Sequence, residues 1–177
     1  MSWLISPKVA GAELSWLTEE GSLTERLKKE FNDVKVDVVY EGIALDKTTD
    51  YIREVLIKSH DEPMIFAKTQ LKASDLEGAW KCLKTLGQQS LANILFKDPD
   101  ISRLSLLYRI CEPGDILYTH IKSLEYVDKE ILWVRQAEWE RHGKNILLTE
   151  VFLQFQNLDH LDFFCSFHKV CCDDKHF

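Results

Sequence analysis

One glutamate stands out in an apolar stretch near the end of the chain. In NILLTEVFLQF, from Asn145 to Phe155, Glu150 lies among isoleucine, leucine, valine and phenylalanine. A strand sends alternate side chains to opposite faces, and both faces of this segment are mostly apolar, which is typical of a central strand. An ionised carboxylate there costs several kcal/mol unless it is paired or binds a proton. We expect either a cationic partner for Glu150 or a strand register that lets it reach water.

Three positively charged residues interrupt other predicted strands. Arg53 lies in YIREVLIK, Lys68 in MIFAKTQL and Arg135 in ILWVRQAEWE. A single arginine in a strand is more often an edge residue or a structural ion-pair partner. A guanidinium, however, matches a carboxylate, and each shielded charge-assisted hydrogen bond contributes about 1.5–3 kcal/mol. Three cations and Glu150, each on a different strand of one sheet, could converge on a cavity for a small dianion or a hydroxylated carboxylate.

Capping patterns and turn residues outline the elements that must position these side chains. Ser22 precedes Glu25 and Ser74 precedes Glu77 at capping-box spacing, so two helices are predicted to begin there, the second ending at Gly87. A further short helix is predicted in QSLANILF. The turn segments SHDEP and RHGK each lie between two predicted strands and predict hairpins. This order predicts a single α+β domain whose antiparallel sheet carries helices on one side.

The composition excludes several functional classes. With 177 residues, 45% of them hydrophobic and 29% charged, the chain is long enough for one domain with one core. A net charge of −7 argues against a nucleic-acid partner. No apolar run reaches the length of a membrane span, and the amino terminus lacks a signal-peptide pattern, so we expect a cytoplasmic protein. The chain also lacks GxSxG, GxGxxG, Walker and HExxH signatures, which leaves cofactor-free chemistry or plain binding.

The last part of the chain has a different character. We expect one domain over residues 1–156 and an appended extension over 157–177, which is aromatic, rich in cysteine and without a clear period. Five cysteines without a CxxC pair indicate reduced thiols and no disulfide framework. A zinc site in this extension is an alternative, but its tight spacing matches zinc modules poorly, so we expect no metal. The residues of that alternative are Cys165, His168, Cys171, Cys172 and His176.

Five segments in order resemble the chorismate lyase (chorismate pyruvate-lyase) family. They are SWLTEEGSLTERL, YIREVLI, EPMIFAKT, LGQQSLANILF and LWVRQAEWERHGKNILLTEVFL, and they extend from about Trp16 to Leu153. The resemblance implies conversion of chorismate to 4-hydroxybenzoate and pyruvate at the start of bacterial ubiquinone synthesis. It also implies a six-stranded antiparallel sheet with helices on one side, a small buried site under helical flaps, and no cofactor. We expect a monomer.

The resemblance also implies roles for individual residues. Arg53 falls on the family arginine that grips the ring carboxylate, and Glu150 falls on the glutamate close to the 4-hydroxyl group. Leu23 lies in the first flap. Leu91 belongs to the carboxylate end of the site, although Ser90 replaces the usual proline before it.

Two further cations match basic positions of the family less closely. Lys68 stands where the family has an arginine, and Arg135 follows Val134 where the family has a glycine. Lys68 keeps the charge but loses the guanidinium fork. We expect both to face the enolpyruvyl carboxylate and the ether oxygen of chorismate.

A binding module without chemistry is the alternative function. The same fold class serves as the effector-sensing domain of some bacterial transcription regulators, and fold similarity does not fix function. Such regulators need a DNA-binding domain, for which the short leader before Trp16 has no room. We therefore favour the enzyme over a sensor of small aromatic acids.

Overall fold

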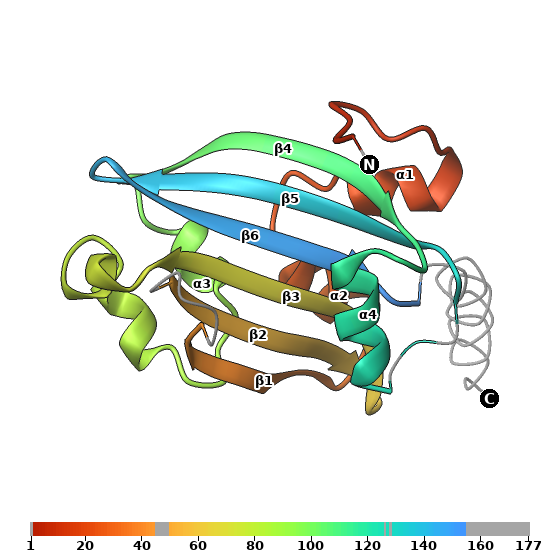
Figure 1. Ribbon diagram of the computed structural model, residues 1–177, viewed down its shortest axis with the longest axis horizontal. Helices are drawn as coiled ribbons and strands as arrows, with labels where there is room; N and C mark the ends of the chain where they lie inside the picture. Colours follow the sequence, from red (N-terminus) through yellow and green to blue (C-terminus); the bar gives the residue numbers. More distant parts are fainter. Residues whose placement is uncertain (1, 45–49, 126, 128, 155–177) are drawn as a thin grey trace, which may run out of the picture.

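One antiparallel sheet of six strands organises the molecule (Figure 1). The computed structural model describes residues 2–44, 50–125, 127 and 129–154. The strands lie in the order β1-β2-β3-β6-β5-β4. Their bounds are β1 Val34–Ile43, β2 Asp50–Ser59, β3 Glu62–Lys72, β4 Ile101–Cys111, β5 Leu132–Arg141 and β6 Lys144–Phe152. The α+β class and the antiparallel sheet are thereby confirmed, whereas the predicted boundary near residue 156 lies outside the described residues.

Both predicted hairpins form. The turn between β2 and β3 has His60 and Asp61 at φ 50° and 64°, and the turn between β5 and β6 has His142 and Gly143 at φ 51° and 73°. Positive φ at two successive turn residues suits the right-handed twist of the flanking strands. Since β3 pairs with β6, the two hairpins join at the centre of the sheet, and Glu150 on β6 lies on a central strand.

The helices follow the sequence pattern in part. The described helices are α1 Gly11–Leu17, α2 Leu23–Glu30, α3 Ala92–Leu95 and α4 Ile116–Ser123, with the 3₁₀ helices η1 Ala73–Glu77 and η2 Lys81–Thr85. Ser22 caps α2 as predicted, because its hydroxyl accepts a hydrogen bond from the Glu25 amide at 3.1 Å. The single helix predicted from Ser74 is wrong: Gly78, at φ −129° and ψ −115°, separates two short 3₁₀ turns. No described helix has the length and apolar composition needed to cross a membrane.

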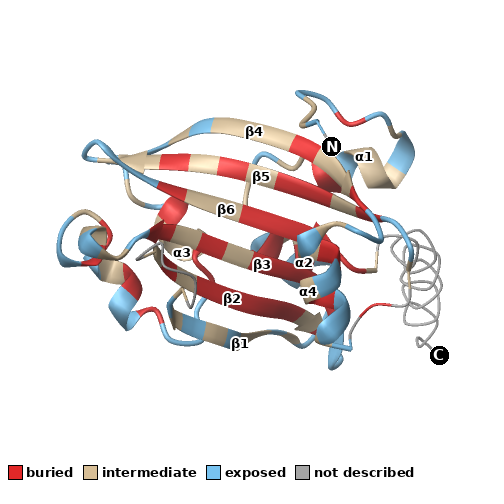
Figure 2. Cartoon of the chain, viewed as in Figure 1, coloured by how far each residue is buried: buried red, intermediate tan, exposed pale blue. Residues whose placement is uncertain are grey.

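The helices divide unequally between the two faces of the sheet. The segments α1, α2, α3, η1 and η2 pack on one face, which we call the cavity face, and contribute to two of the three apolar clusters. The expectation that all helices lie on one side is wrong for α4, which packs on the opposite face with Phe66 and Val151 (Figure 1). Burial is densest on the central strands, while the edge strands β1 and β4 are more open (Figure 2).

Candidate active site

A cavity lies between the cavity face of the sheet and the beginnings of α2 and α3. The empty space in it, counted together with the open solvent at its mouth, is about 590 Å³. The strands contribute Val36, Arg53, Val55, Ile57, Ala67, Thr69, Arg103, Leu106, Arg135, Ala137, Trp139, Leu148 and Glu150. The covering segments contribute Ser22, Leu23, Thr24, Ser90, Leu91, Ala92, Leu95 and Phe96. A mostly apolar wall with a few charged groups is typical of a site for a small organic anion.

Arg53 is held at one side of this cavity. Its side chain is 2% exposed, and Nη2 donates hydrogen bonds to the carbonyl oxygens of Gly87 (2.7 Å) and Gln89 (3.2 Å). Its Nε lies 3.6 Å from Glu41 Oε2 and is a buried donor without a hydrogen-bond partner among the described residues. Burial lowers the pKa of Arg53, and the nearby Glu41 partly offsets this effect. The guanidinium stays charged at neutral pH, so the cavity wall contains a buried cation with hydrogen-bonding capacity to spare.

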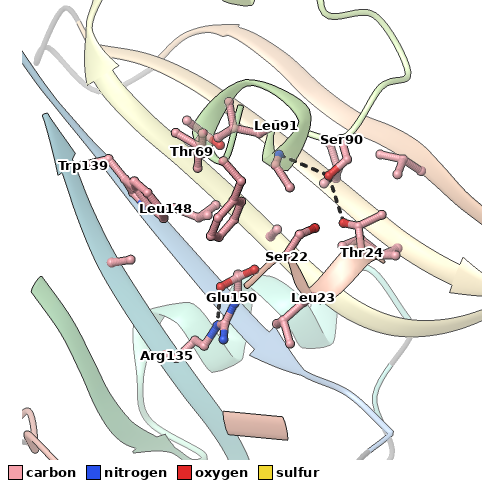
Figure 3. Close-up of a pocket in the computed structure, with 18 of the residues that line it drawn as sticks. Ser22, Leu23, Thr24, Thr69, Ser90, Leu91, Arg135, Trp139, Leu148 and Glu150 are labelled. Atoms are coloured by element: carbon pink, nitrogen blue, oxygen red, sulfur yellow. Dashed lines mark hydrogen bonds and ion pairs between the residues drawn. The ribbon is translucent and has the colours of Figure 1, made fainter. Parts of the chain in front are cut away.

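Arg135 is the cationic partner of Glu150. The two residues are paired across β5 and β6, and Arg135 Nε donates to Glu150 Oε2 at 2.5 Å (Figure 3). Arg135 Nη1 also donates to the carbonyl oxygen of Glu19 at 2.9 Å. Both side chains are buried, at 5% and 8% exposure. The apolar strand therefore tolerates a carboxylate because a guanidinium neutralises it, and the pair faces the cavity.

Two covering segments meet over the cavity. Leu23, at the start of α2, and Leu91, before α3, are both buried and line it. Beside them the hydroxyl groups of Thr24 and Ser90 form a buried hydrogen bond of 2.9 Å (Figure 3). The Ser90 hydroxyl also accepts from the Ala92 amide at 3.3 Å. The serine that replaces the proline expected at this position thus links the two covering segments.

Lys68 does not reach the cavity. In the register of the sheet it is paired with Glu54 and Thr149, so its side chain lies on the opposite face from Arg53. There its Nζ is 3.7 Å from Glu54 Oε1, and His120 of α4 contacts the other oxygen of that carboxylate at 2.8 Å. The expected convergence of all three cations is wrong for Lys68, because strand pairing places it and Arg53 on different faces.

Arg103 is a cavity residue that the sequence patterns did not identify. It lies on β4 opposite Trp139 and lines the cavity with it. A register shift between Arg103 and Ser105 changes the alternation of side chains along β4. No sequence signal identified this shift, since unbroken alternation would direct Arg103 to the other face.

Metal binding finds no support in the described part of the chain. No group of three or more His, Cys, Asp or Glu side chains there is arranged to hold a metal ion. Cys82 and Cys111 are free thiols, and burial raises the pKa of Cys111 to about 11. The zinc alternative of the carboxyl-terminal extension lies outside the described residues.

Comparison with known proteins identifies the family of this chain. A family model described as chorismate lyase matches residues 3–160. The chain belongs to the chorismate lyase family. It is 30% identical over 167 residues to a probable chorismate pyruvate-lyase of Nitrosomonas europaea, covering 86% of this chain and 93% of that protein. It is 34% identical over 154 residues to probable chorismate pyruvate-lyase 2 of Pseudomonas entomophila, covering 79% of each.

Among solved structures, this chorismate lyase family protein matches a possible transcriptional regulator, YydK of Bacillus subtilis. The TM-score is 0.46 at 6% identity, covering 68% of this chain and 57% of that one. A similarity of this size carries no argument about function. The cavity of this chorismate lyase family member brings together five of the six predicted site residues, which are Leu23, Arg53, Leu91, Arg135 and Glu150. Their roles remain predictions.

Proposed function

We propose that this protein is a chorismate pyruvate-lyase that eliminates pyruvate from chorismate and releases 4-hydroxybenzoate for ubiquinone synthesis. One observation carries the proposal: a single partly enclosed cavity contains the Arg53 guanidinium and the buried Arg135–Glu150 pair. We further propose that the enzyme acts as a cytoplasmic monomer without a cofactor.

The spacing of the charged groups suits a flat aromatic acid. Arg53 on β2 and Glu150 on β6 are separated by two strand spacings and by two residues along the sheet. These steps correspond to a Cα separation on the order of 12 Å. Both side chains line the cavity, and we propose that a six-membered ring with polar groups at opposite ends lies between them. Arg53 would hold the ring carboxylate, and Glu150 would contact the hydroxyl group at the other end.

The proposed reaction does not require the protein to form a covalent bond with the substrate. The ether bond between the ring and the enolpyruvyl group breaks, the carbon bearing the hydroxyl loses a proton, and the ring becomes aromatic. The departing enolpyruvate gains a proton at its methylene carbon and becomes pyruvate. Aromatisation drives the elimination, so the protein orients the dianion, excludes water and stabilises charge on the departing oxygen.

Glu150 and Arg135 act as a pair in this proposal. Arg135 holds the Glu150 carboxylate in a fixed orientation through its hydrogen bond. In that orientation the carboxylate can accept a hydrogen bond from the substrate hydroxyl group or a proton from the carbon that bears it. The proton reaches the methylene carbon either through Glu150 or directly in a concerted step. In both routes Arg135, although paired with Glu150, is placed to donate a hydrogen bond near the ether oxygen.

The test is to mix the purified protein with chorismate and to measure 4-hydroxybenzoate and pyruvate together. We expect equimolar products, with activity reduced about 100-fold or more by Arg53→Ala, because at least one buried charge-assisted contact is lost. Glu150→Gln should also reduce activity strongly. Glu54→Gln is the matched control, since Glu54 is a buried glutamate of the same sheet that faces away from the cavity.

The outcome separates an enzyme from a sensor. A folded wild-type protein that binds 4-hydroxybenzoate but forms no products would contradict the lyase proposal and favour the binding module. Equal losses in Glu150→Gln and Glu54→Gln would show that the assay reports on folding and not on the site.

A further inference from the structure

The substrate proposed above carries two carboxylates, and the charges in the cavity do not yet account for both. Arg53 lies 3.6 Å from the partly exposed Glu41 but keeps a buried Nε donor that has no hydrogen-bond partner among the described residues, so it can still bind one carboxylate. Arg135, in contrast, donates its Nε hydrogen bond to the buried Glu150 at 2.5 Å. With Lys68 on the opposite face, a second carboxylate needs another cation. A buried anion without one is costly, so a further positive group at the cavity is required.

Arg103 meets this requirement because of an irregularity in β4. Leu106 is paired with Ala137, and both line the cavity. Regular alternation from Leu106 would place Leu104 on the same face and Arg103 on the other. Instead the register shifts, so that Arg103 is paired with Trp139 on the cavity face and Leu104 is left 54% exposed. The bulge leaves Leu104 exposed, which is unfavourable for an apolar side chain. It also turns the Arg103 side chain toward the cavity.

The surroundings of Arg103 leave its charge uncompensated. Its Nη1 donates to the carbonyl oxygen of Glu20 at 3.0 Å, and its guanidinium carbon lies 5.5 Å from the centre of the Trp139 ring. Within the described part of the chain, no carboxylate is at ion-pair distance from Arg103. The Trp139 ring packs edge-on against the Phe96 ring, with the two ring centroids 5.1 Å apart. Arg103 is therefore a half-buried cation beside an aromatic wall, four strand spacings across the sheet from Arg53.

We propose that Arg103 binds the second carboxylate of the substrate, the one on the enolpyruvyl group. The inference rests on the proposed function, because it is this substrate that supplies two carboxylates at different positions. The product 4-hydroxybenzoate has lost that carboxylate. Arg103 therefore distinguishes substrate from product, whereas Arg53 contacts both.

A purely structural role makes a different prediction. The Glu20 carbonyl belongs to the loop that leads into α2, and Arg103 could serve only to anchor this loop. Loss of that anchor would disturb the covering segment and weaken substrate and product alike. The ratio of the two affinities separates a carboxylate-binding residue from an anchor.

The experiment compares Arg103→Gln with the wild type and with Arg109→Gln. Glutamine keeps a donor for the Glu20 carbonyl but removes the charge, and Arg109 is an arginine of the same strand paired with Val134 on the opposite face. For each protein, kcat/KM for chorismate is measured by pyruvate release, and the Kd of 4-hydroxybenzoate by calorimetry. We expect Arg103→Gln to lower kcat/KM by about 10-fold to 100-fold, as for one lost charge-assisted contact, with less than about a twofold change in the product Kd.

Two outcomes overturn the inference. Equal weakening of substrate and product means that Arg103 anchors the loop, and no change in either means that the second carboxylate is bound elsewhere. If Arg103→Gln does not fold, Arg103→Lys, which keeps the charge but loses the fork, should show a smaller loss confined to chorismate. If the wild type releases no pyruvate, the lyase proposal fails separately, and the same comparison is made with the Kd of chorismate in place of kcat/KM.

Discussion

Each face of the sheet buries a glutamate beside basic groups, yet the two arrangements differ in what surrounds them. On the cavity face, Glu150 pairs with Arg135 below a space that the covering segments leave open. On the opposite face, Glu54 contacts His120 and Lys68 beneath α4. A buried carboxylate with a cation is thus insufficient to mark a site. The cavity beside the Arg135–Glu150 pair is the feature that leaves room for a ligand to contact these side chains.

The largest loss of stability is expected from removing one member of the Arg135–Glu150 pair. Arg135→Met leaves the Glu150 carboxylate buried without its partner and should lower the free energy of unfolding by about 3–5 kcal/mol. The double variant Arg135→Met/Glu150→Leu should recover most of this loss, because no buried charge then remains. Urea denaturation at neutral pH measures both. A double variant no more stable than the single one would show that the pair contributes through packing instead of charge.

The hydrogen bond between Thr24 and Ser90, which joins the two covering segments, should slow the dissociation of a bound ligand. Thr24→Val removes the buried hydrogen bond to Ser90 with little change in shape. A site complementary to a flat phenolic acid should release its product slowly. One lost hydrogen bond of about 1 kcal/mol should make 4-hydroxybenzoate dissociate about fivefold faster.

Stopped-flow displacement measures this rate, with Thr119→Val as the control. Thr119 is an exposed threonine of α4 on the opposite face, and its hydroxyl bonds only within its own helix among the described residues. Equal acceleration in both variants, or in neither, would argue against a closing role for the Thr24–Ser90 bond.

On the opposite face, a change of pH should alter the free energy of unfolding without altering the activity. The hydrogen bond from Arg109 holds the pKa of Asp115 below its ordinary value, and the Asp115 carboxylate also caps α4 at the Leu117 amide. A lowered pKa means stabilisation that is present at neutral pH and is lost as the pH falls through the pKa of the folded state. Asp115→Asn keeps a capping oxygen but loses the ion pair, so it should cost no more than about 1 kcal/mol at pH 7.

Denaturation midpoints of the wild type and Asp115→Asn should converge as the pH is lowered. A constant difference between the two proteins from neutral to acidic pH would rule out the ion pair as the source of the effect. Turnover of chorismate at pH 7 should be unaffected, since α4 does not line the cavity.

The smallest effect is expected at Lys68. If its position on the opposite face decides its role, Lys68→Met should change kcat/KM for chorismate by less than about twofold, within the range of surface substitutions. The same assay as for Arg103 serves here. A loss comparable to that of Arg103→Gln would reinstate Lys68 as a substrate-binding residue and would break the contrast between the two faces.

Local sequence patterns determined much of the framework because their physical causes are local. The turn residues at 60–61 and 142–143 specify two hairpins, and the Ser22 hydroxyl satisfies an amide at the start of α2. The apolar residues around Glu150 require a partner for it, since desolvating a lone charge is costly. The segment after Ser74 was harder to predict, because a capping pattern does not reveal that Gly78 ends the first turn.

The tertiary structure decided which charges meet. Whether Arg53, Lys68 or Arg135 pairs with Glu150 depends on strand order and register, and these follow from the pairing of β3 with β6 and β5 with β6. The place of Arg103 depends on a single extra residue at Leu104. Side-chain alternation has a period of two, so one inserted residue moves a side chain to the other face without any local sequence signal. The sequence by itself determined that this sheet would bury charges, and only the fold decided which of them share the cavity.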